Sequence, residues 1–156
     1  MTKSLIDTAK KKLSLVNVVM KNGSFAINSD LKATFIEEEF GDGRNTETQT
    51  MCGVIQAYPL IAKDESQYAY IFEFEAAVRI LSKDDEDNEI IIFMINGLFE
   101  VSYNSKEKLR EEELKAFANA QVAFDAWPYW RSFVHESCSK MGTPRLRIGG
   151  YIPNSN

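Results

Sequence analysis

The segment Asn119–Leu146 most strongly limits what this chain can fold into. It contains both tryptophans of the sequence, its only histidine and one of its two cysteines. Asp125 before Ala-Trp-Pro is typical of a helix N-cap followed by proline in the first turn, where no intrahelical N–H bond is lost. Gly142 predicts a left-handed cap, and Pro144 prevents the helix from continuing. We therefore predict a helix over 127–141 with an apolar stripe formed by Trp130, Phe133, Val134, Ser137, Cys138 and Met141.

Two consecutive segments before this helix predict strands. Tyr68–Leu81 alternates between apolar and polar positions, which is typical of a half-buried antiparallel strand. One of its faces would carry Tyr70, Phe72, Phe74, Ala76, Val78 and Ile80, and the other Glu73, Glu75 and Arg79. Glu89–Tyr103 begins with a run that is apolar on both faces and is then interrupted by Asn96-Gly97. A glycine inside such a run indicates a bulge or a bend.

The first half of the chain predicts two more strands. Leu15–Asn28 opens on a β-rich run, and Thr48–Ile61 is long, with a proline near its end where a strand tolerates it. Asn22-Gly23 within the first of these segments is a turn signal. Residues 24–28 therefore either continue that strand or pair with it.

Helical patterns flank the predicted sheet. Residues 3–15 carry apolar side chains at helical spacing with lysines between them, which predicts a short N-terminal helix. After Asn104 the pattern turns helical, and Ser105 can cap this helix through its hydroxyl. Strands followed by helices favour an α+β fold in which helices cover one face of an antiparallel sheet. For a length of 156 residues we expect one domain spanning 1–156.

Composition and charge argue against several classes of protein. No apolar run approaches the roughly 20 residues that span a bilayer, and lysines stand where a signal peptide would place its apolar block. We therefore expect a cytoplasmic protein. The net charge of −5 argues against nucleic acid and anionic membranes as partners. Cys52 and Cys138 lack Cys-x-x-Cys spacing, which predicts two free thiols rather than a zinc site.

The sequence predicts no catalytic residues, no cofactor and no metal site. His135 and Cys138 are three residues apart, so they can share a face of the predicted helix. Because a nucleophile and its base normally meet across elements, we favour a helix histidine beside a packed cysteine. Runs of neighbouring carboxylates are typical of solvated surface, and a glycine-rich phosphate loop is absent. A small enzyme that uses His135 is the least favoured alternative.

Three motifs in the second half of the chain occur in a specific order. Asn96–Val101 places Asn-Gly-Leu-Phe at the strand interruption, and Trp127–Arg131 reads Trp-Pro-Tyr-Trp-Arg. Ser139–Leu146 follows with Ser-Lys-Met-Gly-Thr-Pro-Arg-Leu. With these motifs, the stretch from about Tyr68 to Ile152 resembles the SecB family of export chaperones. The family pattern has its proline one position later, and the two earlier strand segments match more loosely.

The resemblance implies a four-stranded antiparallel sheet followed by two helices. Family members are homotetramers, dimers of dimers, that hold unfolded polypeptides in long apolar grooves without ATP. By this resemblance the polypeptide-binding residues would lie on the second strand and at the start of the last helix. For each of them ordinary core packing is the alternative. The candidates are Met51, Ile55, Tyr58, Ile61, Trp127, Tyr129 and Trp130.

The resemblance also implies two kinds of partner besides unfolded or precursor polypeptides. One is a translocation motor, which the family often engages through an acidic C-terminal tail with cysteine and histidine. The sequence ends Ile-Pro-Asn-Ser-Asn without such a pattern, so the acidic face with Glu73 and Glu75 is the candidate for docking a basic partner. The other partner is an antitoxin, because SecB-like chaperones also serve toxin–antitoxin systems.

Overall fold

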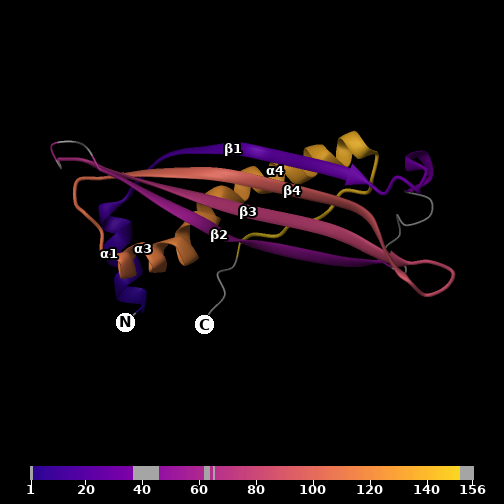
Figure 1. Cartoon of the computed structure of the whole chain (residues 1–156), viewed down its shortest axis with the longest axis horizontal. Helices are drawn as coiled ribbons and strands as arrows, with labels where there is room; N and C mark the ends of the chain where they lie inside the picture. The colour runs from indigo at the N-terminus through magenta and orange to yellow at the C-terminus, as the bar shows by residue number, and fades with distance from the viewer. Residues whose placement is uncertain (1, 37–45, 62–63, 65, 152–156) are drawn as a thin grey trace.

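The computed structural model describes residues 2–36, 46–61, 64 and 66–151. Figure 1 shows four long strands with helices at one end and behind them. The elements, in chain order, are α1 (Thr2–Lys12), β1 (Ser14–Ile27), the 3₁₀ turn η1 (Ala33–Phe35), β2 (Glu47–Ile61), β3 (Tyr68–Lys83), β4 (Glu89–Ser105), α3 (Glu111–Phe117), the π-helical turn η2 (Ala118–Val122) and α4 (Ala123–Met141).

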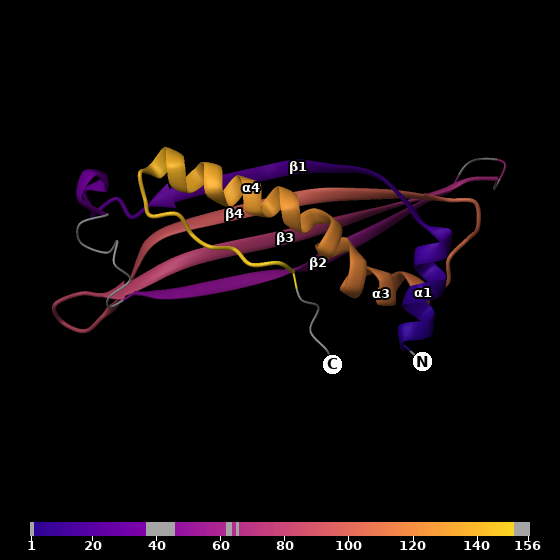
Figure 2. The ribbon, with the colours of Figure 1, turned by 180° about the vertical axis from the view of Figure 1, so that it is seen from behind.

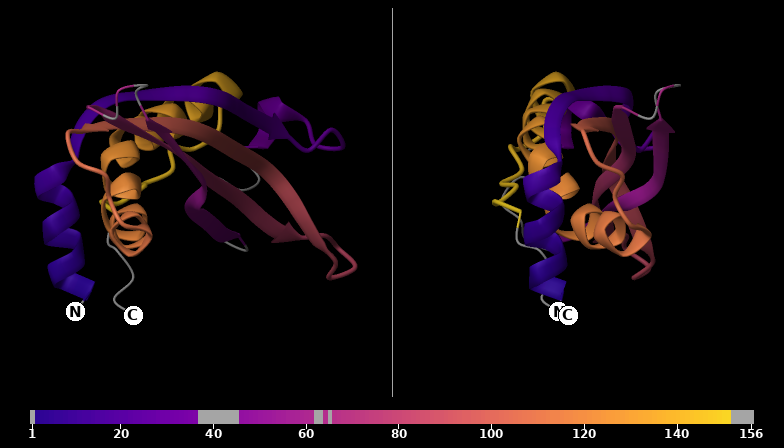
Figure 3. Two further views of the ribbon diagram at one scale, coloured as in Figure 1. Left: turned by 60° about the vertical axis from the view of Figure 1, so that its left-hand side comes forward. Right: turned by 90° about the vertical axis from the view of Figure 1, so that its left-hand side faces the viewer.

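The strands form one antiparallel sheet in the order β1-β4-β3-β2. Figure 2 shows α4 lying across one face of this sheet, over β1 and β4, while the segment after α4 runs back over β3 and β2. We call this side the helix face. The opposite side, which is turned to the viewer in Figure 1, carries none of the helices drawn there, and we call it the open face. Figure 3 shows α1 and α3 packed together at one end.

The alternation of β3 explains why the sheet has one buried face. Its even-numbered apolar residues from Tyr70 to Ile80 are buried on the helix face, whereas Glu75 and Arg79 point to the open face. On β4 the odd-numbered residues from Phe93 to Tyr103 share the helix face with them. The predicted strands therefore pair as a half-buried antiparallel sheet.

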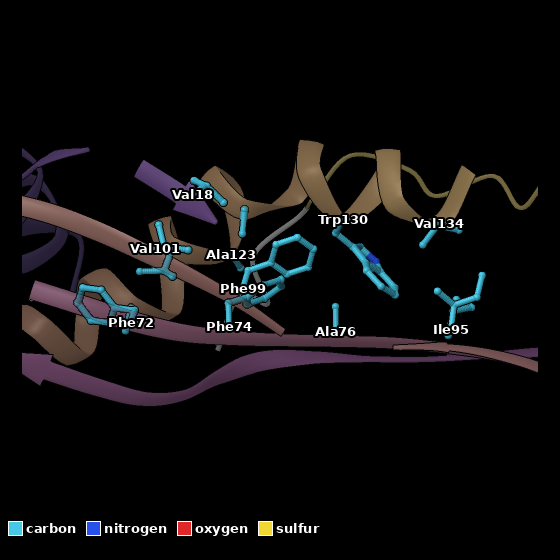
Figure 4. Packing of buried hydrophobic residues seen from close by; sticks show 14 of the residues in the cluster. Val18, Phe72, Phe74, Ala76, Ile95, Phe99, Val101, Ala123, Trp130 and Val134 are labelled. Carbon is cyan, nitrogen blue, oxygen red and sulfur yellow. The ribbon is translucent and has the colours of Figure 1, made fainter. Parts of the chain in front are cut away.

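Helix α4 packs on the sheet through a short row of buried side chains. Figure 4 shows the Trp130 ring between α4 and the strands, near Ala76, with Val134 toward Ile95 and Ala123 toward Phe99. These residues belong to one hydrophobic cluster. The apolar stripe predicted for this helix is buried apart from Phe133, which is half-buried.

Small residues form a row across the helix face of all four strands. Gly23 of β1 pairs with Gly97 of β4, Gly97 with Ala76 of β3, and Ala76 with Cys52 of β2. A Cβ at Gly23 would come within 2.8 Å of the Phe133 ring, and one at Gly97 within 3.2 Å of the Trp130 ring. The row therefore makes room for the aromatic rings of α4.

This packing corrects the interpretation of Asn22-Gly23. The pair does not turn the chain, because β1 runs without a break through Ile27 and residues 24–27 continue the strand. A register shift between Met20 and Asn22 marks a bulge at this point. Gly23 is needed because the Phe133 ring lies against it, not because it lies in a hairpin.

The two predicted helices after β4 form one nearly continuous helical run. The π-helical turn η2 joins α3 to α4, and α4 already begins at Ala123. Asp125 is therefore not an N-cap, and Pro128 lies inside the helix rather than at its first position. Ser105 also has a different role from the predicted one: its Oγ accepts the Glu107 N–H at 3.1 Å and closes a turn before the helix.

Helix α1 is held against α3 by a buried carboxylate. Glu113 is 1% exposed, and its Oε2 accepts the Arg110 N–H at 2.9 Å at the start of α3. Lys12 Nζ at the end of α1 lies 3.2 Å from Glu113 Oε1. The N-terminal helix expected over 3–15 thus spans Thr2–Lys12 and has a specific ionic contact with the rest of the fold.

Candidate functional site

The two edge strands carry most of the exposed apolar side chains. On β2 the exposed large apolar side chains are those of Met51, Ile55, Tyr58, Leu60 and Ile61, and on β1 they are those of Leu15, Val16, Val19, Met20 and Phe25. Edge strands also present unpaired backbone groups, to which an extended chain can add. The candidate site is therefore built on both sheet edges.

The four candidates on β2 do not share one face. Met51 and Tyr58 pair with Ala77 and Ile71 of β3, which places both on the open face. Ile55 lies in a bulge, between the register positions of Val54 and Gln56. A bulge re-aims side chains at an edge.

Ile61 lies at the end of β2, opposite Tyr68. Its side chain is exposed, and its partner is half-buried on the helix face. The β2 candidates therefore all lie along one edge of the sheet, with Met51 and Tyr58 on its open face and Ile61 at the end of the strand.

The three aromatic candidates of α4 have three different environments. Tyr129 is 50% exposed on the outside of the helix, whereas Trp130 is 2% exposed and belongs to the core. Trp127 is half-buried: its Nε1 donates a hydrogen bond to the Gly149 carbonyl at 2.6 Å, and its ring lies 5.4 Å from that of Tyr151. Of the three, only Tyr129 is exposed.

The apolar edge of β1 was not among the candidates from the sequence. Leu15, Met20 and Phe25 pair with helix-face residues of β4, yet they remain exposed on that face. The run Leu-Val-Asn-Val-Val-Met, residues 15–20, is apolar on both faces. In an edge strand this pattern indicates exposed apolar side chains, and it could have identified the β1 edge as a candidate. Phe124, on the outside of α4, extends the exposed apolar surface away from the sheet.

The acidic face is partly neutralised by a lysine. Lys21 lies in the bulge of β1, and its Nζ donates a hydrogen bond to Glu73 Oε1 at 2.6 Å on the open face. This hydrogen bond and the charge of Glu73 raise the pKa of Lys21. Glu73 is 7% exposed, whereas Glu75 is half-buried beside Asn22 and Asn96. Glu75 is thus the more accessible of the two candidate docking carboxylates.

The residues considered for catalysis do not form a relay in the part of the chain that is described. His135 Nδ1 lies 3.1 Å from Arg145 Nη2, and Cys138 is fully buried in the core. Cys52 is an exposed residue on β2, and partial desolvation of its thiol by neighbouring atoms raises its pKa. Among the described residues no cluster of three or more His, Cys, Asp or Glu could hold a metal ion.

A cavity of about 760 Å³ lies at the α1 end of the sheet. It is bordered by Lys11 and Lys12 of α1 and by Lys106 after β4, together with hydroxyl and amide side chains. The exposed apolar side chains of the sheet edges, and not this cavity, are the main candidate for binding.

The described helices include none that is long and apolar enough to cross a membrane.

Comparison with known proteins gives a match at the level of structure. No protein-family model matches the sequence, and no curated protein is significantly similar to it. The chain superposes on a SecB-like chaperone of Mycobacterium tuberculosis, Rv1957, solved in complex with a ChAD peptide from the HigA1 antitoxin. The TM-score is 0.70 at 13% identity, and the match covers 96% of this chain and 98% of that one. The chain has a SecB-like fold.

The match covers nearly the whole chain, so the SecB-like fold includes the short N-terminal helix, the four antiparallel strands and the long helix. The fold expected from the three sequence motifs is therefore confirmed. A protein of unknown function from Streptococcus agalactiae gives a TM-score of only 0.38 at 10% identity.

Proposed function

We propose that this protein is an ATP-independent holdase that binds unfolded polypeptides on its exposed apolar edges. The observation that carries the proposal is the concentration of exposed large apolar side chains on β1 and β2. A soluble protein that leaves a contiguous apolar surface in water normally uses it for binding. The SecB-like fold, and its occurrence in a chaperone solved with an antitoxin peptide, support the same conclusion.

The proposed site suits partners of many sequences. Fully burying one Leu, Ile or Met side chain contributes about 1.5–3 kcal/mol, so a few such contacts give moderate affinity without a fixed motif. Main-chain hydrogen bonds at a strand edge add affinity that does not depend on sequence. Met51, Ile55, Tyr58 and Ile61 supply the apolar contacts on one edge, and Tyr129 and Trp127 supply them on α4.

We expect the protein to be a homotetramer, a dimer of dimers, that acts in the cytoplasm. The free β1 edge and the exposed Phe124 on α4 leave apolar surface that further copies of the chain can cover. Light scattering at micromolar concentration should give a mass near four times 17.7 kDa. A mass of one chain under these conditions contradicts this part of the proposal.

A dedicated antitoxin chaperone is the second candidate function. It is favoured by one specific observation, the antitoxin peptide bound to the similarly folded mycobacterial chaperone. If this candidate is correct, the protein purified from its host carries one dominant small polypeptide. If the protein is instead a general export chaperone, it carries a range of precursors.

The open face would dock a basic partner such as a translocation motor. Its more accessible candidate carboxylate is that of Glu75, which is half-buried.

The first test is suppression of aggregation. A chemically denatured client is diluted into buffer with or without the purified protein, and light scattering is followed over time. The variant Met51→Ser with Tyr58→Ser should suppress aggregation less well than the wild type at equal concentration. Glu112→Ser with Arg131→Ser, which changes two exposed polar residues of the helices, is the matched control. Equal scattering with and without a folded wild-type protein overturns the proposal.

A further inference from the structure

The segment Thr143–Tyr151 follows α4 without entering a helix or a strand. Figure 2 shows it running back from the end of α4, beside the helix and over β3 and β2. Thr143 N–H donates to the Cys138 carbonyl at 3.1 Å as part of the helix cap. Within the described part of the chain, residues 144–151 make no backbone–backbone hydrogen bond. We call residues 143–151 the tail.

The tail packs like an extended peptide on an apolar surface. Leu146 and Ile148 are half-buried and pack against the core, whereas Arg145 and Arg147, which alternate with them, are exposed. A Cβ added at Gly149 or Gly150 would meet open space. The tail thus buries alternate side chains, as an extended chain does when one side of it faces a surface.

The tail is anchored mainly by one aromatic side chain. Trp127 holds the Gly149 carbonyl through Nε1 and contacts the Tyr151 ring. The Tyr151 hydroxyl lies 3.4 Å from the Asn119 carbonyl, at the long end of the hydrogen-bond range. Burial of the Tyr151 phenol, and to a smaller extent the charge of Cys52, raise its pKa. These few contacts must offset the conformational entropy that is lost when the nine residues of the tail are ordered. The tail is therefore only weakly held.

We propose that the tail is a resident occupant of the helix-face part of the client-binding surface, around Trp127, and that an extended client segment binds there by displacing it. This inference rests on the proposed holdase function and deepens it. The Trp127 indole, the helix face of β2 and the neighbouring core would accept the client in place of the tail. The tail itself defines the client chemistry: an extended segment with apolar side chains at alternate positions, basic residues between them and an aromatic ring nearby.

Because a client must displace the tail, only segments above a certain apolar content can bind. A weakly apolar segment cannot replace Leu146, Ile148 and Tyr151, whereas a long unfolded chain offers several segments that can. The apolar surface under the tail is also covered when no client is bound, which limits self-association.

The first experiment releases the tail. Leu146→Asp with Ile148→Asp places two charges at half-buried positions, and Gly150→Asp, the control, places a charge in the same tail where a Cβ meets open space. The binding of fluorescein-labelled, reduced and carboxymethylated α-lactalbumin, which stays unfolded, is measured by anisotropy. We expect the first variant to bind at least 5-fold more tightly than the wild type and the glycine variant to bind within 2-fold of it. Unchanged or weaker binding by a folded first variant overturns the inference.

The second experiment loosens the tail at its aromatic end. Tyr151→Ala removes the ring whose centroid lies 5.4 Å from that of Trp127, whereas Tyr151→Phe keeps the ring and loses only the hydroxyl, which lies 3.4 Å from the Asn119 carbonyl oxygen. We expect the alanine variant to bind the unfolded probe at least 3-fold more tightly than the wild type, and the phenylalanine variant to bind within 2-fold of it. If a folded Tyr151→Ala protein binds no more tightly than the wild type, the inference is wrong.

These outcomes separate the two proposals. If the wild type and both sets of tail variants fail to bind the unfolded probe, the holdase function itself fails. If the wild type binds but none of the tail substitutions changes its affinity, only the role of the tail fails.

Discussion

Gly23 of β1 and Gly97 of β4 lie directly opposite each other, and two aromatic rings of α4 occupy the space above them. Phe133 lies over the first glycine and Trp130 over the second. Helix α4 can therefore pack closely on the sheet because these two positions have no side chain. This seat fixes the position of Tyr129 and Trp127, and through Trp127 the position of the tail.

Adding one methyl group at this seat should destabilise the protein. Gly97→Ala brings a Cβ within 2.9 Å of the Phe99 ring and 3.2 Å of the Trp130 ring, and overpacking of this kind costs about 1–3 kcal/mol. Gly53→Ala on β2 is the control, because nothing lies within 4 Å of its Cβ position. Urea denaturation should show a lower free energy of unfolding for the first variant only. Equal stability of the two variants would show that α4 can shift without cost.

The contact between α1 and α3 should make stability depend on pH in the acid range. The Arg110 N–H is the main cause that holds the pKa of Glu113 below its usual value of 4.5; burial opposes the shift, and Lys12 assists it. Because the folded pKa is lower than the unfolded one, this stabilisation is complete above about pH 4.5. It is lost as the pH falls through the folded pKa.

Glu113→Gln tests this contact directly. The variant should lose about 1.5–3 kcal/mol at pH 7, which is typical of hydrogen bonds to a charged group. It should also show a weaker decrease of stability between pH 5 and pH 3 than the wild type. Chemical denaturation at several pH values measures both quantities. Parallel pH profiles for the two proteins would contradict the assigned role of Glu113.

A buried tyrosine connects β4 to the start of α4. The Tyr103 hydroxyl donates to Asp125 Oδ2 at 2.6 Å, and Gln121 of the π-helical turn donates to the other oxygen. Burial first, and then this hydrogen bond, raise the pKa of Tyr103 strongly. Tyr103→Phe should therefore cost about 2 kcal/mol, whereas Tyr129→Phe on the exposed side of α4 should stay within about 0.5 kcal/mol of the wild type. Thermal unfolding of both variants checks this, and similar melting temperatures would refute it.

The sheet could be predicted from the sequence because its central strands follow a simple rule. β3 alternates between apolar and charged residues, and the odd-numbered residues of β4 from Phe93 to Tyr103 continue the same buried face. The end of α4 was equally predictable, since Gly142 has a φ of 65° in the left-handed region, where glycine is favoured.

The start of α4 and the path of β1 could not be predicted in the same way. Asn22-Gly23 has the sequence of a turn, and only the Phe133 ring from a distant helix explains why a glycine is needed in a continuous strand. Pro128 suggested a first turn, but the π-helical turn before it lets the helix begin earlier. Both differences come from contacts between segments far apart in sequence, which a local pattern does not contain.

The candidate binding residues illustrate the same limit. Trp127, Tyr129 and Trp130 stand within four positions of one another, yet their environments are a contact with the tail, solvent and the core. Helical spacing placed Trp130 on the apolar stripe of the predicted helix. It could not predict that the Gly149 carbonyl would accept a hydrogen bond from the Trp127 indole.

The most direct test of the account is a comparison of one client in two states. The protein is titrated into the same labelled polypeptide, once folded and once held unfolded by reduction and carboxymethylation, and anisotropy gives both dissociation constants. The account predicts micromolar or tighter binding of the unfolded form, at least 10-fold tighter than that of the folded form, and weaker binding by Met51→Ser with Tyr58→Ser. Equal affinity for the two forms, or no binding of either by the folded wild-type protein, would contradict it.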